Sequence, residues 1–152
     1  MKLSAKDTVC YNIKFAWHAI SRMYNEKASE YDGTSSVGFV LLNIDSEKGT
    51  PSTQIGPKLG MEATSLSRML KTLEEKNLIF RVPQENDKRV VKIFLTEEGK
   101  KKKAIAKKVV KEFNLKVYER VPIEKLKIFF EVIDEIIKTV EEEELLKEQD
   151  NI

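Results

Sequence analysis

The 152-residue chain contains very few of the side chains that bind metals or act as nucleophiles, with one cysteine, Cys10, and one histidine, His18. One cysteine excludes a disulfide within the chain. One cysteine and one histidine are too few for a zinc cluster. No Ser/His/Asp group and no pair of catalytic carboxylates stands out. We therefore expect no metal, no cofactor and no enzymatic activity.

The chain also lacks long apolar stretches. No run approaches the roughly 18 residues that a membrane-spanning helix needs. Residues 1–9 have no apolar segment flanked by basic residues, so they do not form a signal peptide. A lone cysteine fits a reducing compartment. These observations predict a cytoplasmic protein without membrane contact.

Charge of one sign is absent overall but not locally. The formal net charge is +2, yet residues 51–103 hold 12 Lys and Arg against 7 Asp and Glu. Residues 139–152 hold one Lys against six acidic residues. This distribution indicates a middle segment that faces phosphates and a tail that faces away from them. A solvated surface with uneven charge would give the same counts.

Apolar spacing predicts two helices in the first third of the chain. The first covers residues 9–30 and ends at the turn signal Asp32-Gly33. The second lies within residues 36–45. Its apolar run 37–42 would also fit a buried strand, but its position between two helices favours a helix.

A second pair of helices follows, joined by a tight turn. We expect the first to begin near Thr53 or Gln54, because Pro57 is harmless only in a first turn, and to end at Gly60. Residues 62–76 form a stronger amphipathic helix, and Asn77 suits the left-handed cap after it. Helix, glycine-containing turn and helix together predict a helix-turn-helix.

The remaining pattern completes a winged helix-turn-helix. Two strand-like runs, 78–82 and 89–95, are joined by a polar turn and predict a β-hairpin, the wing. Two long helices follow. The predicted fold is mostly α with a small β-hairpin wing (α+β). Residues 35–99 would form the DNA-binding domain, and residues 1–34 with 100–152 a helical dimerisation region.

The predicted DNA contacts lie on the helix 62–76 and on the hairpin tip. The outward face of the helix carries Thr64, Ser65, Arg68 and Lys71. Short hydroxyls and cations are the side chains that read base edges in the major groove. At the tip, Lys88 and Arg89 would reach a neighbouring minor groove. The alternatives are a polar helix face without a partner and a charged turn that only protects a strand edge.

Two segments resemble the MarR family of bacterial regulators. Residues 87–99 match its signature D-x-R, five residues, L-T-x-x-G, and residues 64–79 resemble its recognition helix. The resemblance implies that Arg89 enters the minor groove and that Asp87 orients nearby arginines. It also implies a homodimer on a pseudo-palindromic site in double-stranded DNA. Asn77 replaces the usual glycine, and Gly56-Pro57 replaces ordinary helix formers.

The resemblance further implies a repressor that is released by a small aromatic or lipophilic effector. The candidate pocket residues are Trp17, His18, Tyr24, Tyr31 and Phe39, although aromatic residues at helical spacing also form plain cores.

The apolar stripe of the last helix, residues 126–140, exceeds what so short a chain can cover by itself and supports a dimer.

Three alternatives stay open at this point. A branch of the family senses organic hydroperoxides through a cysteine in its first helix, and Cys10 occupies such a position, with Tyr11 and Tyr24 as candidate neighbours. A protein-interaction module of the same winged fold is another reading. The lysine run 100–103 is either a solvated face or a phosphate contact.

Overall fold

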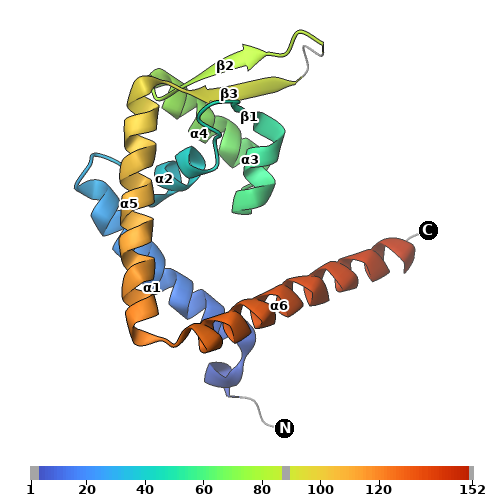
Figure 1. Ribbon diagram of the computed structural model, residues 1–152. Helices are drawn as coiled ribbons and strands as arrows, with labels where there is room; N and C mark the ends of the chain where they lie inside the picture. The colour runs from blue at the N-terminus through green and yellow to red at the C-terminus, as the bar shows by residue number, and fades with distance from the viewer. Residues whose placement is uncertain (1–3, 87–89, 151–152) are drawn as a thin grey trace. The chain divides into compact units, whose positions relative to one another are not determined.

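The computed structural model describes residues 4–86 and 90–150, and within these the chain forms helices and one small sheet (Figure 1). The elements in chain order are the 3-10 helix η1 (Ala5–Asp7), α1 (Val9–Ser29), α2 (Ser35–Leu42), β1 (Thr50–Pro51), α3 (Ser52–Leu59), α4 (Ala63–Glu75), β2 (Ile79–Pro83), β3 (Val91–Leu95), α5 (Glu97–Arg120) and α6 (Ile123–Asp150). The predicted fold class is therefore confirmed. None of the described helices is long and apolar enough to span a membrane.

The chain divides into two compact units at Val110. The first contains every element from η1 to β3 and the first part of α5. The second contains the rest of α5 and all of α6. This division concerns packing. The functional division into residues 35–99 and the two flanking segments stays a prediction.

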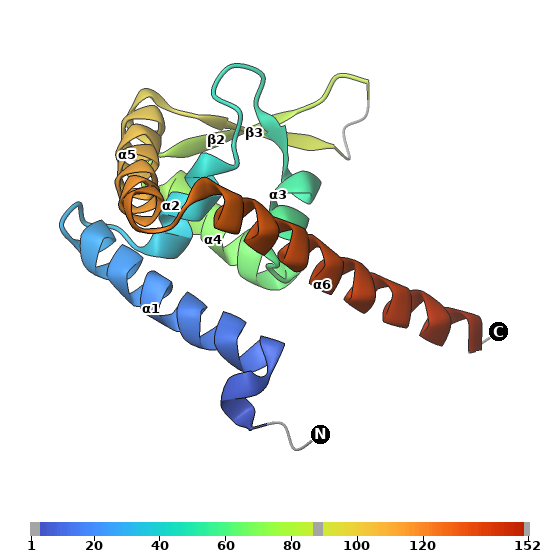
Figure 2. The ribbon, with the colours of Figure 1, turned by 60° about the horizontal axis from the view of Figure 1, so that its bottom comes forward.

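The sheet is antiparallel, with strand order β1-β3-β2. Its register pairs Ile79 with Leu95 and Phe80 with Phe94. Because side chains alternate between the two faces of a strand, Ile79 and Leu95 are buried while Phe80 is exposed on the other face. Figures 1 and 2 show α2, α3 and α4 on one side of this sheet.

One apolar core holds this winged domain together. It contains Val40, Leu41, Ile44, Ile55, Leu66, Leu70, Leu73, Leu78, Ile79, Ile93 and Leu95. Each of α2, α3, α4, β2 and β3 contributes to it, so the core fixes the helix pair against the hairpin. The apolar run 37–42 is helical, as predicted, and supplies Val40 and Leu41.

The start of α3 differs from the prediction. The helix begins at Ser52, because β1 pairs with β3 up to Pro51 and the chain turns directly into the helix. No side chain caps its first turn, and Pro57 lies in its second turn, not its first. A proline there removes one intrahelical hydrogen bond. The buried Ile55 anchors the short helix in spite of this loss.

The predicted helix end at Gly60 and the predicted left-handed cap at Asn77 are confirmed. Gly60 ends α3 with φ of 60°, and Asn77 follows α4 with φ of 55°. The elements that the sequence patterns did not predict are the short ones, η1 and the two-residue strand β1. The hairpin strands begin and end within one or two residues of the predicted bounds.

Candidate nucleic-acid interface

The rotation of α4 about its own axis is fixed by three buried leucines. Leu66, Leu70 and Leu73 follow one another at helical spacing and pack in the core. Met69 packs partly against the same core, and the other residues between these leucines are exposed. The four predicted contact residues on this helix, Thr64, Ser65, Arg68 and Lys71, are all exposed.

The cations on this face are only loosely held. Lys71 Nζ lies 3.9 Å from Glu75 Oε1, and both side chains are mostly exposed, so the pair is weak. Arg68 forms no ion pair within the described part of the chain, and its main-chain carbonyl accepts a hydrogen bond from Thr72 Oγ1 at 3.1 Å. The guanidinium of Arg68 is thus placed to bind an external anion or base.

The beginning of α4 favours negative charge. Glu62 precedes the helix with an extended conformation and gives no side-chain cap. The first backbone N–H groups of a helix have no partner within it, and they attract phosphate. Thr64 and Ser65 stand in this first turn. The helix end and its hydroxyl side chains together suit a nucleic-acid backbone.

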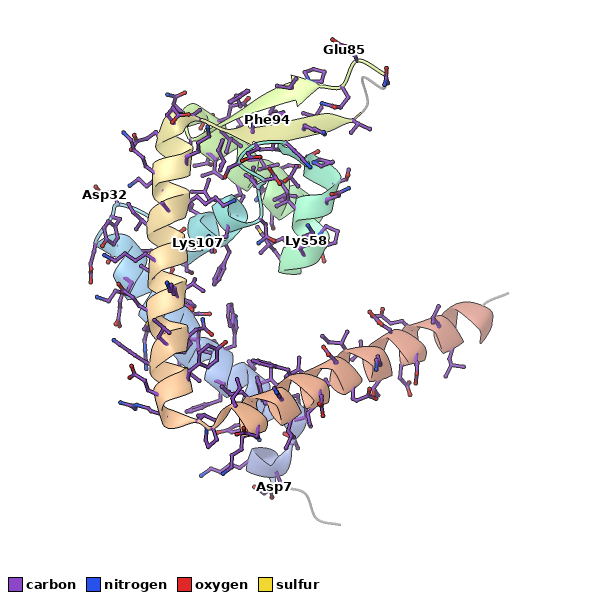
Figure 3. All side chains as sticks on the ribbon, in the orientation of Figure 1. Asp7, Asp32, Lys58, Glu85, Phe94 and Lys107 are labelled. Carbon is purple, nitrogen blue, oxygen red and sulfur yellow. The ribbon has the colours of Figure 1, made fainter. Side chains whose placement is uncertain are left out.

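Lys58 is a candidate contact that the sequence analysis missed. It is exposed in the last turn of α3, the other helix of the pair (Figure 3). Gly56 on the same helix is buried, and a Cβ there would lie 3.2 Å from the Met61 carbonyl. The tight approach of α3 to the turn thus requires a small residue at 56. The position of Lys58 in the last turn of α3, next to the turn that leads into α4, is the sequence signal that could have predicted this contact.

The wing is attached to α4 by an ion pair. Arg81 Nε on β2 donates to Glu74 Oε2 on α4 at 3.1 Å. The hairpin is closed by the Gln84 N–H, which donates to the Val90 carbonyl at 3.0 Å, and Glu85 stands at its tip (Figure 3). The predicted wing residues Asp87, Lys88 and Arg89 lie outside the described residues.

The lysine run at the start of α5 is engaged within the chain. Lys100 and Lys101 pair with Glu97 and Glu98, at 2.8 Å and 3.6 Å. The hydrogen bond from Lys100 lowers the pKa of Glu97. Lys102 and Lys103 are half-buried and do not form the solvated face suggested by the sequence. Their ammonium groups donate to the backbone carbonyls of Tyr31 and Ile44, respectively.

A cavity lies between α1, α2 and α5, entirely within the first unit. Its empty space is about 540 Å³, counted with its mouth to solvent. The lining residues are Tyr24, Ala28, Tyr31, Gly33, Thr34, Ser35, Val37, Gly38, Phe39, Leu41, Leu42, Lys102, Ile105, Ala106, Val109 and Val110. Burial raises the pKa of the Tyr24 phenol above its usual value.

Three of the five candidate pocket residues line this cavity, namely Tyr24, Tyr31 and Phe39. Trp17 contacts it only through Phe39, with ring centroids 5.9 Å apart, and His18 is exposed on α1 away from the lining. The contribution of α5 to this cavity was not predicted from the sequence. The spacing of four residues between Ile105 and Val109 was the signal for it.

Cys10 is exposed near the beginning of α1, and its thiol lies 3.6 Å from Thr8 Oγ1. Tyr24 stands 14 residues further along the same helix, which is about 21 Å along the axis. The two side chains of one chain are therefore far apart. Within the described residues, no group of His, Cys, Asp or Glu is placed to hold a metal ion.

The helix pair, its exposed cationic face and the attached hairpin define the chain as a winged helix-turn-helix protein of the DNA-binding class. The model of the MarR family matches residues 34–91. The regulator SarZ of Staphylococcus aureus, an HTH-type transcriptional regulator, is 31% identical over 111 residues, which is 70% of this chain and 75% of SarZ. The chain belongs to the MarR family and is a DNA-binding transcriptional regulator, not an enzyme.

Solved structures show the same fold. The S. aureus MepR–DNA complex superposes with a TM-score of 0.79 at 21% identity, covering 87% of this chain and 98% of MepR. PcaV from Streptomyces coelicolor, in complex with its natural ligand, gives 0.77 at 18% identity and covers 91% and 97% of the two chains.

Proposed function

We propose that the chain acts in the cytoplasm as a homodimeric repressor that binds a pseudo-palindromic DNA site and leaves it when a small ligand binds. The observation that carries the proposal is the exposed surface of Thr64, Ser65 and Arg68 at the start of α4. In it, uncapped helix N–H groups, hydroxyls and a guanidinium face the same side. MepR, of the same fold, has been solved with DNA.

The ligand would act through the cavity beside α2. This helix forms one wall of the cavity and also contributes Val40 and Leu41 to the core that supports α3 and α4. A ligand that shifts α2 would change the placement of the helix pair. Only differential binding to the two arrangements can shift their equilibrium. PcaV, of the same fold, has been solved with its natural ligand.

A homodimer is supported by apolar side chains that stay exposed in the single chain. On α1 these include Val9, Phe15 and Trp17, which are 53%, 66% and 51% exposed. On α6 they include Ile128, Phe129, Val132, Ile137 and Val140. Exposed apolar surface of this extent is unusual for a soluble monomer and marks an interaction surface.

The test of DNA binding uses one arginine on α4. Arg68→Ala should weaken binding to a genomic fragment retained by the wild-type protein by about 10-fold or more, since a bidentate base contact contributes about 1–3 kcal/mol. The matched control is Arg120→Ala, an exposed arginine at the end of α5. Fluorescence anisotropy with labelled DNA measures both.

Equal affinity of the Arg68 variant and the wild type would refute the role of α4. A loss of affinity in the control variant of the same size would mean that bulk charge, not this contact, determines binding. Neither the redox alternative nor the protein-interaction alternative is favoured by a contact among the described residues.

A further inference from the structure

Two consecutive lysines of α5 bind backbone carbonyls at the ends of two different helices. The Lys102 ammonium donates to the Tyr31 carbonyl, in the turn after α1. The Lys103 ammonium donates to the Ile44 carbonyl, just after α2. Ile44 is fully buried, whereas Tyr31 is exposed. A buried carbonyl without a partner is costly, so the bond from Lys103 contributes more to the fold than the bond from Lys102.

The segment that follows Ile44 is ordered by its own polar groups. Asp45 Oδ1 accepts the N–H groups of Lys48 and Glu47, both at 2.8 Å. These two hydrogen bonds hold the pKa of the Asp45 carboxyl below its usual value. The charge of Lys103 acts in the same direction, so its ammonium lies within electrostatic range of this carboxylate as well as on the Ile44 carbonyl.

Thr50 connects this segment to the helix-turn-helix. Its hydroxyl accepts the Asp45 N–H at 2.8 Å and donates to the Asn43 carbonyl at 3.4 Å. Thr50 is buried and pairs with Ile93 of β3, and α3 begins two residues later at Ser52. Because β1 has only two residues and no side chain caps α3, the segment before them helps to determine where α3 starts.

We infer that Lys103 is a positioning residue for DNA binding. Its hydrogen bond to the Ile44 carbonyl fixes residues 43–50 and thereby holds the start of α3, the first helix of the helix-turn-helix. Since Lys103 stands on α5, the placement of the helix pair depends on α5. The inference rests on the proposed DNA contacts of α4 for its effect on affinity, whereas the effect on residues 43–50 can be measured without DNA.

The first measurement follows amide hydrogen exchange in the full chain without DNA. Lys103→Met keeps an unbranched side chain but has no donor for the Ile44 carbonyl. Exchange within residues 43–50 should become about tenfold faster, the effect expected for losing a hydrogen bond from a charged group. Lys102→Met is the matched comparison at the neighbouring position and should leave residues 43–50 as protected as in the wild type.

The second measurement is the affinity for a genomic DNA fragment that the wild-type protein retains. Lys103→Met should bind about tenfold more weakly, because DNA binding must then supply the order that the hydrogen bond provides. Lys103→Arg keeps a charged donor and should restore both the protection and the affinity. The control Lys107→Met removes the same charge from an exposed position of α5 and should bind as the wild type does (Figure 3).

Unchanged exchange in the Lys103→Met variant, or faster exchange without weaker DNA binding, would overturn the inference. So would a Lys103→Arg variant as impaired as Lys103→Met, since packing and not the donor would then be responsible. A weaker Lys107→Met variant would assign the effect to bulk charge. The proposed contact surface is tested separately: if Lys103→Met weakens binding and Arg68→Ala does not, the positioning role stands and the role of Arg68 is wrong.

Discussion

At the scale of single residues, the L-T-x-x-G part of the family signature has a steric explanation in this chain. The hydroxyl of Thr96 donates to the Asn77 carbonyl at 2.7 Å and accepts the Gly99 N–H at 3.0 Å. It thus caps α5 and attaches it to the exit of α4. A Cβ at Gly99 would lie 1.9 Å from the carbonyl oxygen of Leu78, which accepts the Thr96 N–H. Only glycine fits there.

Gly99→Ala should therefore destabilise the protein by at least about 2 kcal/mol, because the clash is with backbone and no side chain can move aside. Urea unfolding measures the change. Gly38→Ala is the matched control, since its Cβ would meet Ala106 at an ordinary 3.5 Å inside a helix. That substitution should stabilise by about 0.5–1 kcal/mol, the difference in helix propensity. Similar effects at both glycines would contradict the steric explanation.

Some residue-level features could be predicted from the sequence and others could not. Gly60 and Asn77 announce left-handed backbone because few other residues adopt it. Pro57 led to a wrong prediction of where α3 begins. The pairing of β1 with β3 determines that start, and this pairing is not local in the sequence. The hydrogen bond from Lys102 to the Tyr31 carbonyl could not be predicted for the same reason, since the two residues are 71 positions apart.

At the scale of elements, the wing and α4 are held together by the Arg81–Glu74 pair as well as by the core. Their side chains are 37% and 44% exposed, so solvent screens the interaction. A double-mutant cycle with Arg81→Ala and Glu74→Ala should give a coupling energy of about 0.5–1 kcal/mol at low salt, falling as salt is added.

The Lys71–Glu75 pair serves as the reference for this cycle. Its atoms are 3.9 Å apart and its side chains are 76% and 64% exposed, so its coupling energy should be at most about 0.3 kcal/mol. Denaturant unfolding of each variant supplies both values. No coupling between Arg81 and Glu74 at low salt, or a coupling no larger than the reference, would contradict the proposed attachment.

The elements themselves were largely readable from the sequence because each long helix and both hairpin strands carry their own periodicity. The helix over residues 35–42 was ambiguous, since its apolar residues leave no polar face, and its neighbours decided it. β1 could not be predicted, because a two-residue strand has no period and exists only through its pairing with β3.

At the scale of the whole molecule, the sequence predicted an excess of apolar side chains in the terminal helices, and the structure shows many of them exposed. Phe129 on α6 is 54% exposed. If these residues form the dimer interface, Phe129→Lys should yield a monomer by light scattering, because a buried unpaired charge is costly. Glu131→Lys is the control, two residues on and thus on another side of the helix. A dimeric Phe129 variant would exclude this part of α6 from the interface.

The central claim is that two copies of α4 and its wing read one DNA site together. Hydroxyl-radical footprinting on a genomic DNA fragment that the wild-type protein retains tests this claim most directly. Two protected half-sites should appear, with centres about one helical turn, or 34–36 Å, apart and related by a pseudo-twofold sequence symmetry. A single isolated half-site, or protection without any sequence symmetry, would contradict the account.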